Sequence, residues 1–334
     1  MAYIHKKIIG NTPYYTLRIS YRKDGRVITK DLESLGSNLS KISIEDLEKR
    51  HKAEIKKSYK TIKKFLEKNY YYGQTKKLKK DAFLSSEQLR RVEACKLHFQ
   101  EKFLQLDEKT QKSFFEQFLI RFANNSTAIE GNTITLAQAT KLLREGILPK
   151  GKDIREVYDL QNTKQVFEEL LFNENFSFSI DDVSFVHDSL LKNIDLRTGL
   201  RDHDISILGQ PFTPSPARYV KEDLELLLSW LKKQHHLHPL VLTVLFHHKF
   251  EAIHPFSDGN GRTGRMLLNI LLLQKEFPPL VVAQRRRSEY LRALNKADMA
   301  IKKDLFSIDK KHYEPLFSFM VDSFEETYWD VFLF

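Results

Sequence analysis

The feature that most restricts the fold of this chain is a polar, glycine-rich stretch followed directly by an apolar one. Residues 254–265 read His-Pro-Phe-Ser-Asp-Gly-Asn-Gly-Arg-Thr-Gly-Arg, and residues 266–273 read Met-Leu-Leu-Asn-Ile-Leu-Leu-Leu. Leu267, Ile270 and Leu271 recur at helical spacing, so the second stretch predicts a buried helix. The glycines let the backbone turn tightly before that helix, whose first amides have no partner within it. Together the two stretches predict an anion site at a helix N-terminus.

The side chains of the glycine-rich stretch suit phosphate groups. Arg262 and Arg265 are three residues apart, so they project on the same side of the first helical turn. Asn260 adds neutral donors between Gly259 and Gly261, where the backbone can approach a ligand closely. We therefore interpret the stretch as a phosphate site.

Two further residues indicate chemistry at this site. Asp258 can hold a magnesium ion through its carboxylate, with phosphate oxygens and water as the other ligands. His254 lies just before the loop, where a neutral imidazole could take a proton from an incoming hydroxyl. A base, a metal ligand, backbone amides and two arginines are the groups that transfer of a nucleotide's phosphoryl group requires.

At these residues the chain resembles the Fic family, whose signature is His-x-Phe-x-Asp-Gly-Asn-Gly-Arg-x-x-Arg; every fixed position is filled here. Fic proteins are mostly adenylyltransferases that move AMP from ATP to a Ser, Thr or Tyr hydroxyl of a target protein. The resemblance implies an all-helical catalytic core, with His254 as general base and Asp258 as ligand of Mg²⁺. It also implies that the phosphates are bound by Asn260, Gly261, Arg262 and Arg265.

A second motif lies upstream, where Ser126 to Glu130 is predicted to be a last helical turn that ends at Gly131. A glutamate at a helix C-terminus is unfavourable beside the dipole, which argues for a cationic partner. The sequence Ser-x-x-x-Glu-Gly resembles the Fic inhibitory motif. That resemblance implies that Glu130 pairs with Arg265 and so occupies the arginine that the γ-phosphate of ATP needs.

Residues 198–216 contain a short β-branched run and three prolines, which predict a short hairpin followed by an extended segment. This part resembles the Fic flap, an edge strand that docks the target segment. The resemblance assigns the docking edge to Ile205, Ser206, Ile207 and Leu208. The alternative is an ordinary surface hairpin.

Residues 285–298 are predicted to be helical and resemble the Fic helix that contributes to the adenine pocket. Tyr290 matches an aromatic position there. Asp298 stands where relatives often have Asn, which leaves the adenine hydrogen bond undecided. Overall the resemblance covers roughly residues 110–325.

Several histidines invite a metal site, but the pattern favours structural roles. His247 and His248 are adjacent on a predicted helix, and adjacent helical residues point about 100° apart. For His187, on another predicted helix, packing is favoured over ligand binding. The one cysteine, Cys95, falls in an apolar helical pattern that indicates a buried, inert thiol.

The first hundred residues are not explained by the signature. Residues 12–32 predict a β-hairpin with its turn at Asp24-Gly25, and residues 35–40 a loop. Ser43 resembles a helix N-cap and begins a lysine-rich helix. We expect two domains: residues 1–75, a β-hairpin and basic helix module, and residues 76–334, a Fic catalytic domain. For the small module, a protein-contact or dimerisation role is favoured over a nucleic-acid-binding sheet.

The fold class expected is therefore mainly α: a Fic helical core with a short β-hairpin flap and the small N-terminal module. Residues 134–172 are read as continuing helical. The aromatic helix expected at residues 313–334 could pack on the core or on a second copy, as in a homodimer. The net charge of +10 allows a nucleic-acid or acidic protein partner. No apolar run reaches the ~20 residues of a membrane span, and the single cysteine suits a reducing cytoplasm.

The predicted function is protein adenylyltransfer from ATP, autoinhibited by Glu130. Two alternatives stay open. The same site could remove AMP from a modified target, with Glu130 steering a water molecule. A protein of another class, a nucleic-acid-binding regulator, would use the basic N-terminal module.

Overall fold

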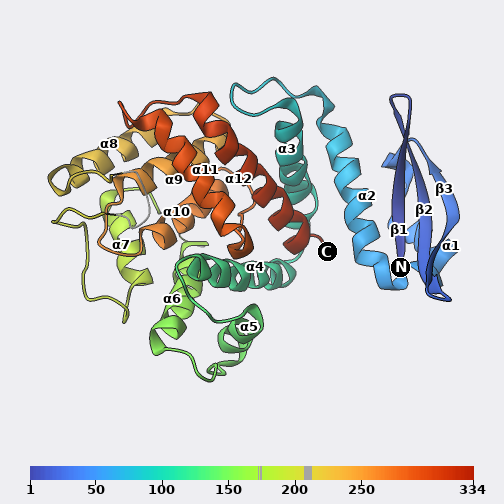
Figure 1. The fold of residues 1–334 in the computed structure, drawn as a ribbon, viewed down its shortest axis with the longest axis horizontal. Coiled ribbons are helices and arrows are strands. Elements are labelled where there is room, and N and C mark those ends of the chain that lie inside the picture. The colour runs from blue at the N-terminus through green and yellow to red at the C-terminus, as the bar shows by residue number, and fades with distance from the viewer. Residues whose placement is uncertain (172, 174, 207–212) are drawn as a thin grey trace.

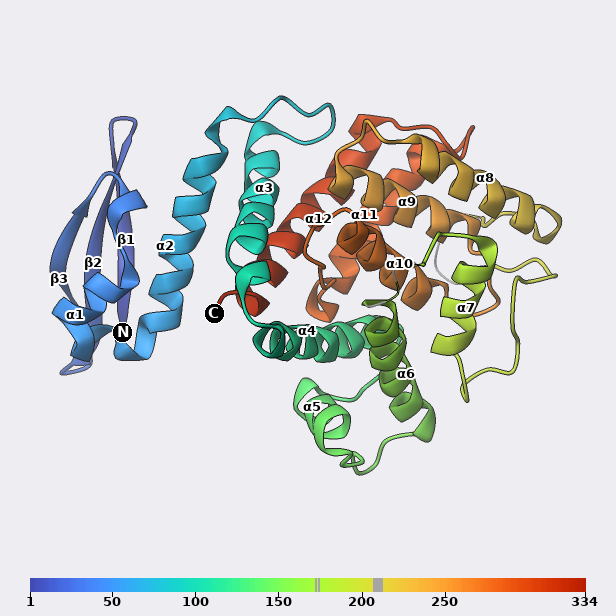
Figure 2. The same cartoon turned by 180° about the vertical axis from the view of Figure 1, so that it is seen from behind.

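The structure is a computed structural model that describes residues 1–171, 173, 175–206 and 213–334 of the 334-residue chain. It is mainly helical, as predicted, with a small antiparallel sheet at one end (Figure 1). Helix α2 lies between the sheet, with α1 packed on it, and the helices from α3 onward in both views (Figures 1 and 2).

The N-terminal sheet has three strands in the order β1-β2-β3. They are β1 (Ala2–Ile9), β2 (Thr12–Lys23) and β3 (Arg26–Gly36). The hairpin predicted for residues 12–32 is confirmed, and its turn has positive φ at Asp24 and Gly25, as a two-residue hairpin requires. Strand β1 was not predicted, and β3 extends into the expected loop.

One face of the sheet packs on two helices, α1 (Ile44–Ile55) and α2 (Tyr59–Gln74). Ser43 is the N-cap of α1, as predicted, and its side chain accepts the amide of Asp46 at 3.0 Å. The core of this module contains Leu17 from the sheet and Leu66 from α2.

The helical body follows. Its α-helices are α3 (Ser86–Glu101), α4 (Glu108–Ile129), α5 (Leu136–Glu145), α6 (Ile154–Leu171), α7 (Ile180–Leu190), α8 (Val220–Lys233), α9 (Pro239–Ile253), α10 (Asn260–Gln274), α11 (Arg287–Ile301) and α12 (Lys310–Val331). Short 3₁₀ turns are η1 (Leu39–Lys41), η2 (Lys56–Ser58), η3 (Thr75–Lys77), η4 (Phe103–Gln105), η5 (Ala217–Tyr219) and η6 (Gln284–Arg286).

Helices α9 and α10 form the centre of the body. Both are buried on nearly every side, and their long apolar runs, residues 239–246 and 266–273, favour this because such runs must be covered by neighbours. The loop between them, residues 254–259, contains the start of the glycine-rich signature, so two buried helices hold the candidate site.

The helical structure predicted for residues 134–172 is present as two helices, α5 and α6, and the segment between them is not helical. Helix α5 ends at Gly146, which adopts a left-handed φ of 70°, and α6 begins only at Ile154. Pro149 and a second left-handed glycine, Gly151, occupy the gap. A proline and two such glycines favour a turn over a helix.

The C-terminal helix α12 packs on the core, and Phe332 and Leu333 beyond it are also buried. The sequence left open whether this helix packs on the core or on a second copy of the chain, and the structure shows packing on the core. Among the described residues, no helix is both long and apolar enough to cross a membrane.

The chain has separate apolar cores on the two sides of α2. Leu66 belongs to the core of the sheet module, whereas Tyr71 belongs to that of the helical body. Lys64 pairs with Asp330 across this junction, and Lys68 pairs with Glu325 at 2.9 Å. The division at residues 75/76 remains a proposal, and α2 contributes to both sides of it.

Candidate active site

The loop from α9 to α10 is shaped by two left-handed residues. His254 caps α9 with a φ of 53°, and Gly259 caps α10 with a φ of 78°. Between them, the Asn260 side chain accepts the amide of Phe256 at 2.9 Å and donates to its carbonyl at 2.7 Å. Asn260 was expected to donate to phosphates; here its buried amide locks the loop, and its contact with a nucleotide remains a prediction.

The tautomer of His254 follows from its contacts. Its Nδ1 lies 3.2 Å from the carbonyl oxygen of Glu251, which can only accept, so Nδ1 carries the hydrogen. The other ring nitrogen, Nε2, is left with a lone pair. Burial lowers the pKa of His254 below its ordinary value, which favours this neutral form. Arg201 holds the residue from behind, because its Nε donates to the His254 carbonyl at 2.8 Å.

His254 borders a cavity of about 290 Å³ at the N-terminus of α10. The lining includes the charged residues Glu130, Asp258 and Arg265 and the apolar residues Leu291 and Leu294. The complete lining is Ile129, Glu130, His248, Glu251, Ala252, His254, Ser257, Asp258, Gly259, Asn260, Gly261, Arg265, Arg287, Tyr290, Leu291, Leu294, Asn295 and Asp298. The structure thus brings His254, Asp258, Arg265, Glu130 and Tyr290 together around one space.

Asp258 stands at the edge of this cavity, with its side chain 38% exposed. Its Oδ1 accepts the Gly259 amide at 2.6 Å and Arg262 at 3.2 Å, and its Oδ2 accepts Arg155 at 3.0 Å. Arg155, from the first turn of α6, was not identified from the sequence. It holds a carboxylate oxygen that a cation could use.

The donor set fits a magnesium ion that arrives with a nucleotide. Among the described residues, no three His, Cys, Asp or Glu side chains are grouped to hold a metal. One carboxylate is nevertheless what Mg²⁺ commonly takes from a protein when phosphate oxygens and water supply the other ligands. Asp258 would hold the ion here.

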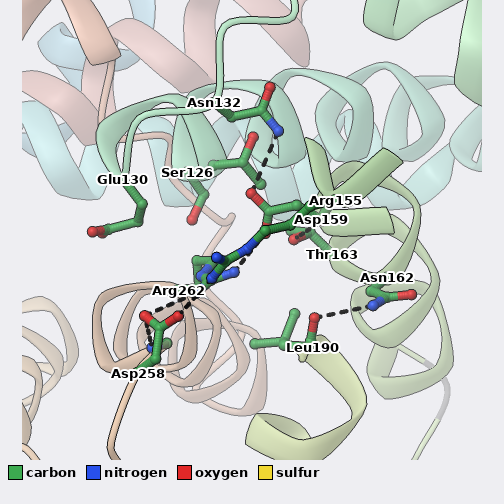
Figure 3. A network of polar contacts seen from close by, with 12 residues as sticks. Ser126, Glu130, Asn132, Arg155, Asp159, Asn162, Thr163, Leu190, Asp258 and Arg262 are labelled. Atoms are coloured by element: carbon green, nitrogen blue, oxygen red, sulfur yellow. Dashed lines mark hydrogen bonds and ion pairs between the residues drawn. The ribbon is translucent and has the colours of Figure 1, made fainter. Parts of the chain in front are cut away.

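Arg262 is fixed by an acid that was also not identified from the sequence. Its Nη1 donates to Oδ1 of Asp159 on α6 at 2.7 Å, and Figure 3 shows Arg262 between Asp159 and Asp258. Asp159 and Arg262 are 8% and 5% exposed. Burial opposes the charge on Arg262, but its two carboxylate neighbours raise its pKa above the usual value.

Arg265 meets the upstream motif as the resemblance implied. Its Nη2 donates to Glu130 Oε1 at 2.7 Å and to the Ser126 carbonyl at 2.8 Å, while its Nε donates to the Ser126 hydroxyl at 3.0 Å. The guanidinium is almost fully buried, whereas the Glu130 carboxylate is 38% exposed and borders the cavity. Burial opposes the charge of Arg265, and Glu130 raises its pKa above the usual value.

Buried polar side chains support the cavity wall. The hydroxyl of Tyr290 lies 2.6 Å from His247 Nε2. Burial lowers the pKa of His247 to about 3, so this histidine is neutral. Burial raises the pKa of the neighbouring Glu251 to about 8, and its Oε1 has no hydrogen-bond partner among the described residues.

Asp298 is held as a hydrogen-bond acceptor in the same wall. The Tyr313 hydroxyl accepts from Lys249 at 3.3 Å, so its own hydrogen is directed to His248 Nδ1 at 2.9 Å. His248 therefore donates from Nε2 to Asp298 Oδ1 at 2.9 Å. The structural role expected for His247 and His248 agrees with these contacts.

His187 packs, as favoured from the sequence, but it also supports the signature loop. Its ring stacks on Phe256 with centroids 3.8 Å apart, and its Nε2 donates to the Asp258 carbonyl at 3.0 Å. In the predicted flap, Ile205 and Ser206 form no strand, and Ile207 and Leu208 lie outside the described residues.

Known proteins resemble this chain in sequence. A family model described as "Fic/DOC family" matches residues 177–272. Protein adenylyltransferase fic-1 of Caenorhabditis elegans is 32% identical over 199 residues, which are 58% of this chain and 39% of that protein. Protein adenylyltransferase Fic of Nematostella vectensis is 29% identical over 216 residues, 60% of this chain and 51% of that protein. The chain thus spans about half the length of these relatives or less.

Solved structures agree in fold. A structure of Fic-1 from Caenorhabditis elegans has a TM-score of 0.60 at 28% identity and covers 72% of this chain and 70% of that one. A Fic domain containing signaling protein from Bacteroides thetaiotaomicron has a TM-score of 0.64 at 19% identity, covering 71% and 95%. The chain therefore contains a Fic/DOC family domain and is related to protein adenylyltransferase Fic.

Proposed function

We propose that this chain is a protein adenylyltransferase, which moves AMP from ATP to a Ser, Thr or Tyr hydroxyl of a target protein or of itself. The observation that carries the proposal is the cavity itself: a neutral His254, the Asp258 carboxylate and Arg265 border one space at the N-terminus of α10. The related proteins named as adenylyltransferases support the same reading.

In this proposal the phosphates of ATP lie against the first turn of α10. The unpaired amides there and the two arginines would offset the phosphate charge, and Asp258 would hold Mg²⁺. The ion, when bound, neutralises charge on the phosphate oxygens. Tyr290 and the apolar lining residues Leu291 and Leu294 would receive the adenine.

His254 acts as the general base. Its Nε2 lone pair takes the proton of the target hydroxyl while the hydroxyl oxygen attacks the α-phosphorus. A bond forms from that oxygen to the α-phosphorus, the bond from the α-phosphorus to the bridging oxygen breaks, and pyrophosphate leaves. In this proposal, residues 205–208, which the resemblance assigns to the flap, would dock the target segment.

Glu130 restrains this reaction in the proposal. While it pairs with Arg265, that arginine is occupied, and a triphosphate would bind in an unproductive pose. The hydrogen bond that Arg265 Nε donates to the Ser126 hydroxyl keeps the guanidinium oriented toward Glu130. The restraint ends when Glu130 moves away.

The test is incorporation of label from α-labelled ATP into protein by the parent, His254→Ala and Glu130→Gly. We expect no labelling by the first variant and increased labelling by the second. Glu145→Gly is a matched control, because Glu145 also ends a helix before a left-handed glycine but is exposed on α5. Equal labelling by parent, His254→Ala and Glu130→Gly would refute the proposal.

Removal of AMP from a modified target is the second candidate. The observation in its favour is that the Glu130 carboxylate borders the cavity and is partly exposed, so it could orient a water molecule. Release of AMP from a pre-modified protein, lost in Glu130→Gly, would identify this reaction. In contrast, transfer from ATP should rise in that variant.

A further inference from the structure

The positive charge of the chain is concentrated in the N-terminal module. Residues 1–75 contain 17 Lys and Arg against 8 Asp and Glu, a formal charge of +9, whereas residues 76–334 contain 37 against 36. Almost the whole net charge of +10 therefore belongs to less than a quarter of the chain. Such an asymmetry favours a polyanionic partner for the module rather than for the helical body.

The sheet of this module offers one uncovered face. Tyr15 and Leu17 on β2 are buried against α1 and α2, and alternate residues of a strand point to opposite faces. Tyr14 and Arg22 therefore belong to the other face, where Lys7 is paired opposite Tyr14. The module lies at one end of the molecule, so this face is not covered by the helical body (Figures 1 and 2).

The β2–β3 hairpin also extends beyond its helical cover. Every residue from 21 to 31 is exposed, including Tyr21 at 46% and Val27 at 64%. This part of the hairpin is basic and carries Arg22, Lys23, Arg26 and Lys30. Arg18 is neutralised by Asp31 on the same sheet, but Arg22, Arg26 and Lys30 form no ion pair among the described residues.

We propose that the N-terminal module binds duplex DNA, with the β2–β3 hairpin in the major groove. A two-stranded β-ribbon fits into that groove. The phosphates that line both edges of the groove would then lie near the basic residues on both sides of the hairpin's turn. The deep, narrow major groove of an RNA duplex does not admit such a ribbon. The sequence favoured a protein-contact module; the third strand, the bare face and the projecting hairpin shift the inference to DNA.

The experiment measures binding of the full chain to a labelled mixed-sequence duplex by fluorescence anisotropy over a series of salt concentrations. Each phosphate contact contributes about −0.9 to the slope of log affinity against log salt. Four to six contacts by the hairpin and neighbouring lysines therefore predict a slope of about −4 to −5.

The test variant replaces Arg22, Arg26 and Lys30 by Gln, and its slope should be shallower by about 3. The control replaces Lys232, Lys233 and Lys303 by Gln. These lysines are equally exposed but lie on the helical body, so the control should keep the parent slope. Unchanged far-UV circular dichroism will show that both variants are folded.

Four outcomes would overturn the inference. Two are a parent that does not bind the duplex at low salt and a hairpin variant that binds like the control. The others are equal or tighter binding of a single strand of the same sequence and equal binding of poly-glutamate, which would favour an acidic protein partner. None of these outcomes depends on adenylyltransfer, so the two proposals are tested separately.

Discussion

Replacement of Asp159 by Asn should destabilise the protein through a residue that lies outside the signature. The substitution keeps the size of the side chain but removes the charge that faces Arg262 at 2.7 Å in a nearly solvent-free setting. Loss of one partner from a buried ion pair costs about 3–5 kcal/mol, because the other charge stays buried without compensation. Arg262 keeps Asp258 at 3.2 Å, so we expect the lower end, about 3 kcal/mol.

For a chain of this size the loss corresponds to a decrease in Tm of about 4 °C. Differential scanning fluorimetry measures it directly. The matched control is Glu168→Gln on the same helix, which removes an exposed pair with Lys164 worth about 0.5 kcal/mol or less. A Tm of Asp159→Asn equal to that of the control would refute the reasoning, since the pair would then be too well hydrated to matter.

Three further predictions follow from the site. Arg155→Gln should tighten Mg²⁺ binding, measured by calorimetry with a non-hydrolysable ATP analogue, by up to about fivefold. The reason is that Arg155, whose side chain is 60% exposed, competes for Asp258 through an ion pair worth at most about 1 kcal/mol. Weaker Mg²⁺ binding by the variant would contradict this. Burial lowers the pKa of His254 below 6.5, so its neutral base form persists into mild acid. In a pH profile of the transfer rate, the decrease on the acid side should therefore have its midpoint below pH 6.5. A midpoint above that value would count against His254 as the base. Burial raises the pKa of Glu251 to about 8 from 4.5, so between pH 4.5 and 8 the native state keeps a proton that the unfolded chain loses, and the parent loses stability as pH rises. Over that window Glu251→Gln should therefore gain stability relative to the parent, by at most about 1.4 kcal/mol per pH unit in urea denaturation. A stability difference that does not change with pH would show that Glu251 does not keep this proton.

Local signals predicted much of the fold. Ser43 caps α1 as predicted, and the same local signal is present at Ser85, Asp107 and Ser179, which cap α3, α4 and α7. These features depend on a few neighbouring residues, so they can be inferred without knowledge of the tertiary structure. Strand β1 was missed although Gly10-Asn11 is a recognisable turn, because its pairing with β2 is needed to distinguish it from an irregular segment.

The candidate site was predicted as far as one contiguous motif defines it. His254, Asp258 and Arg265 border one cavity because a single loop and helix start carry all three. Asp159 and Arg155 approach the loop from α6, about a hundred residues earlier, and nothing in their own surroundings marks them. Which groups fix the arginines and the carboxylate of a motif depends on helix packing, and that information is not local.

Helix α2 has a consequence for any attempt to divide the protein. Its two sides belong to different cores, with Leu66 on one and Tyr71 on the other. A fragment that ended at residue 75 would carry Tyr71 away as a bare aromatic surface, and its complement would be left with an opened wall beside α3. The sheet and the helical body should therefore share a single melting transition in the intact chain. A mechanical force applied to the sheet would act directly on α2, which also contributes to the core of the helical body.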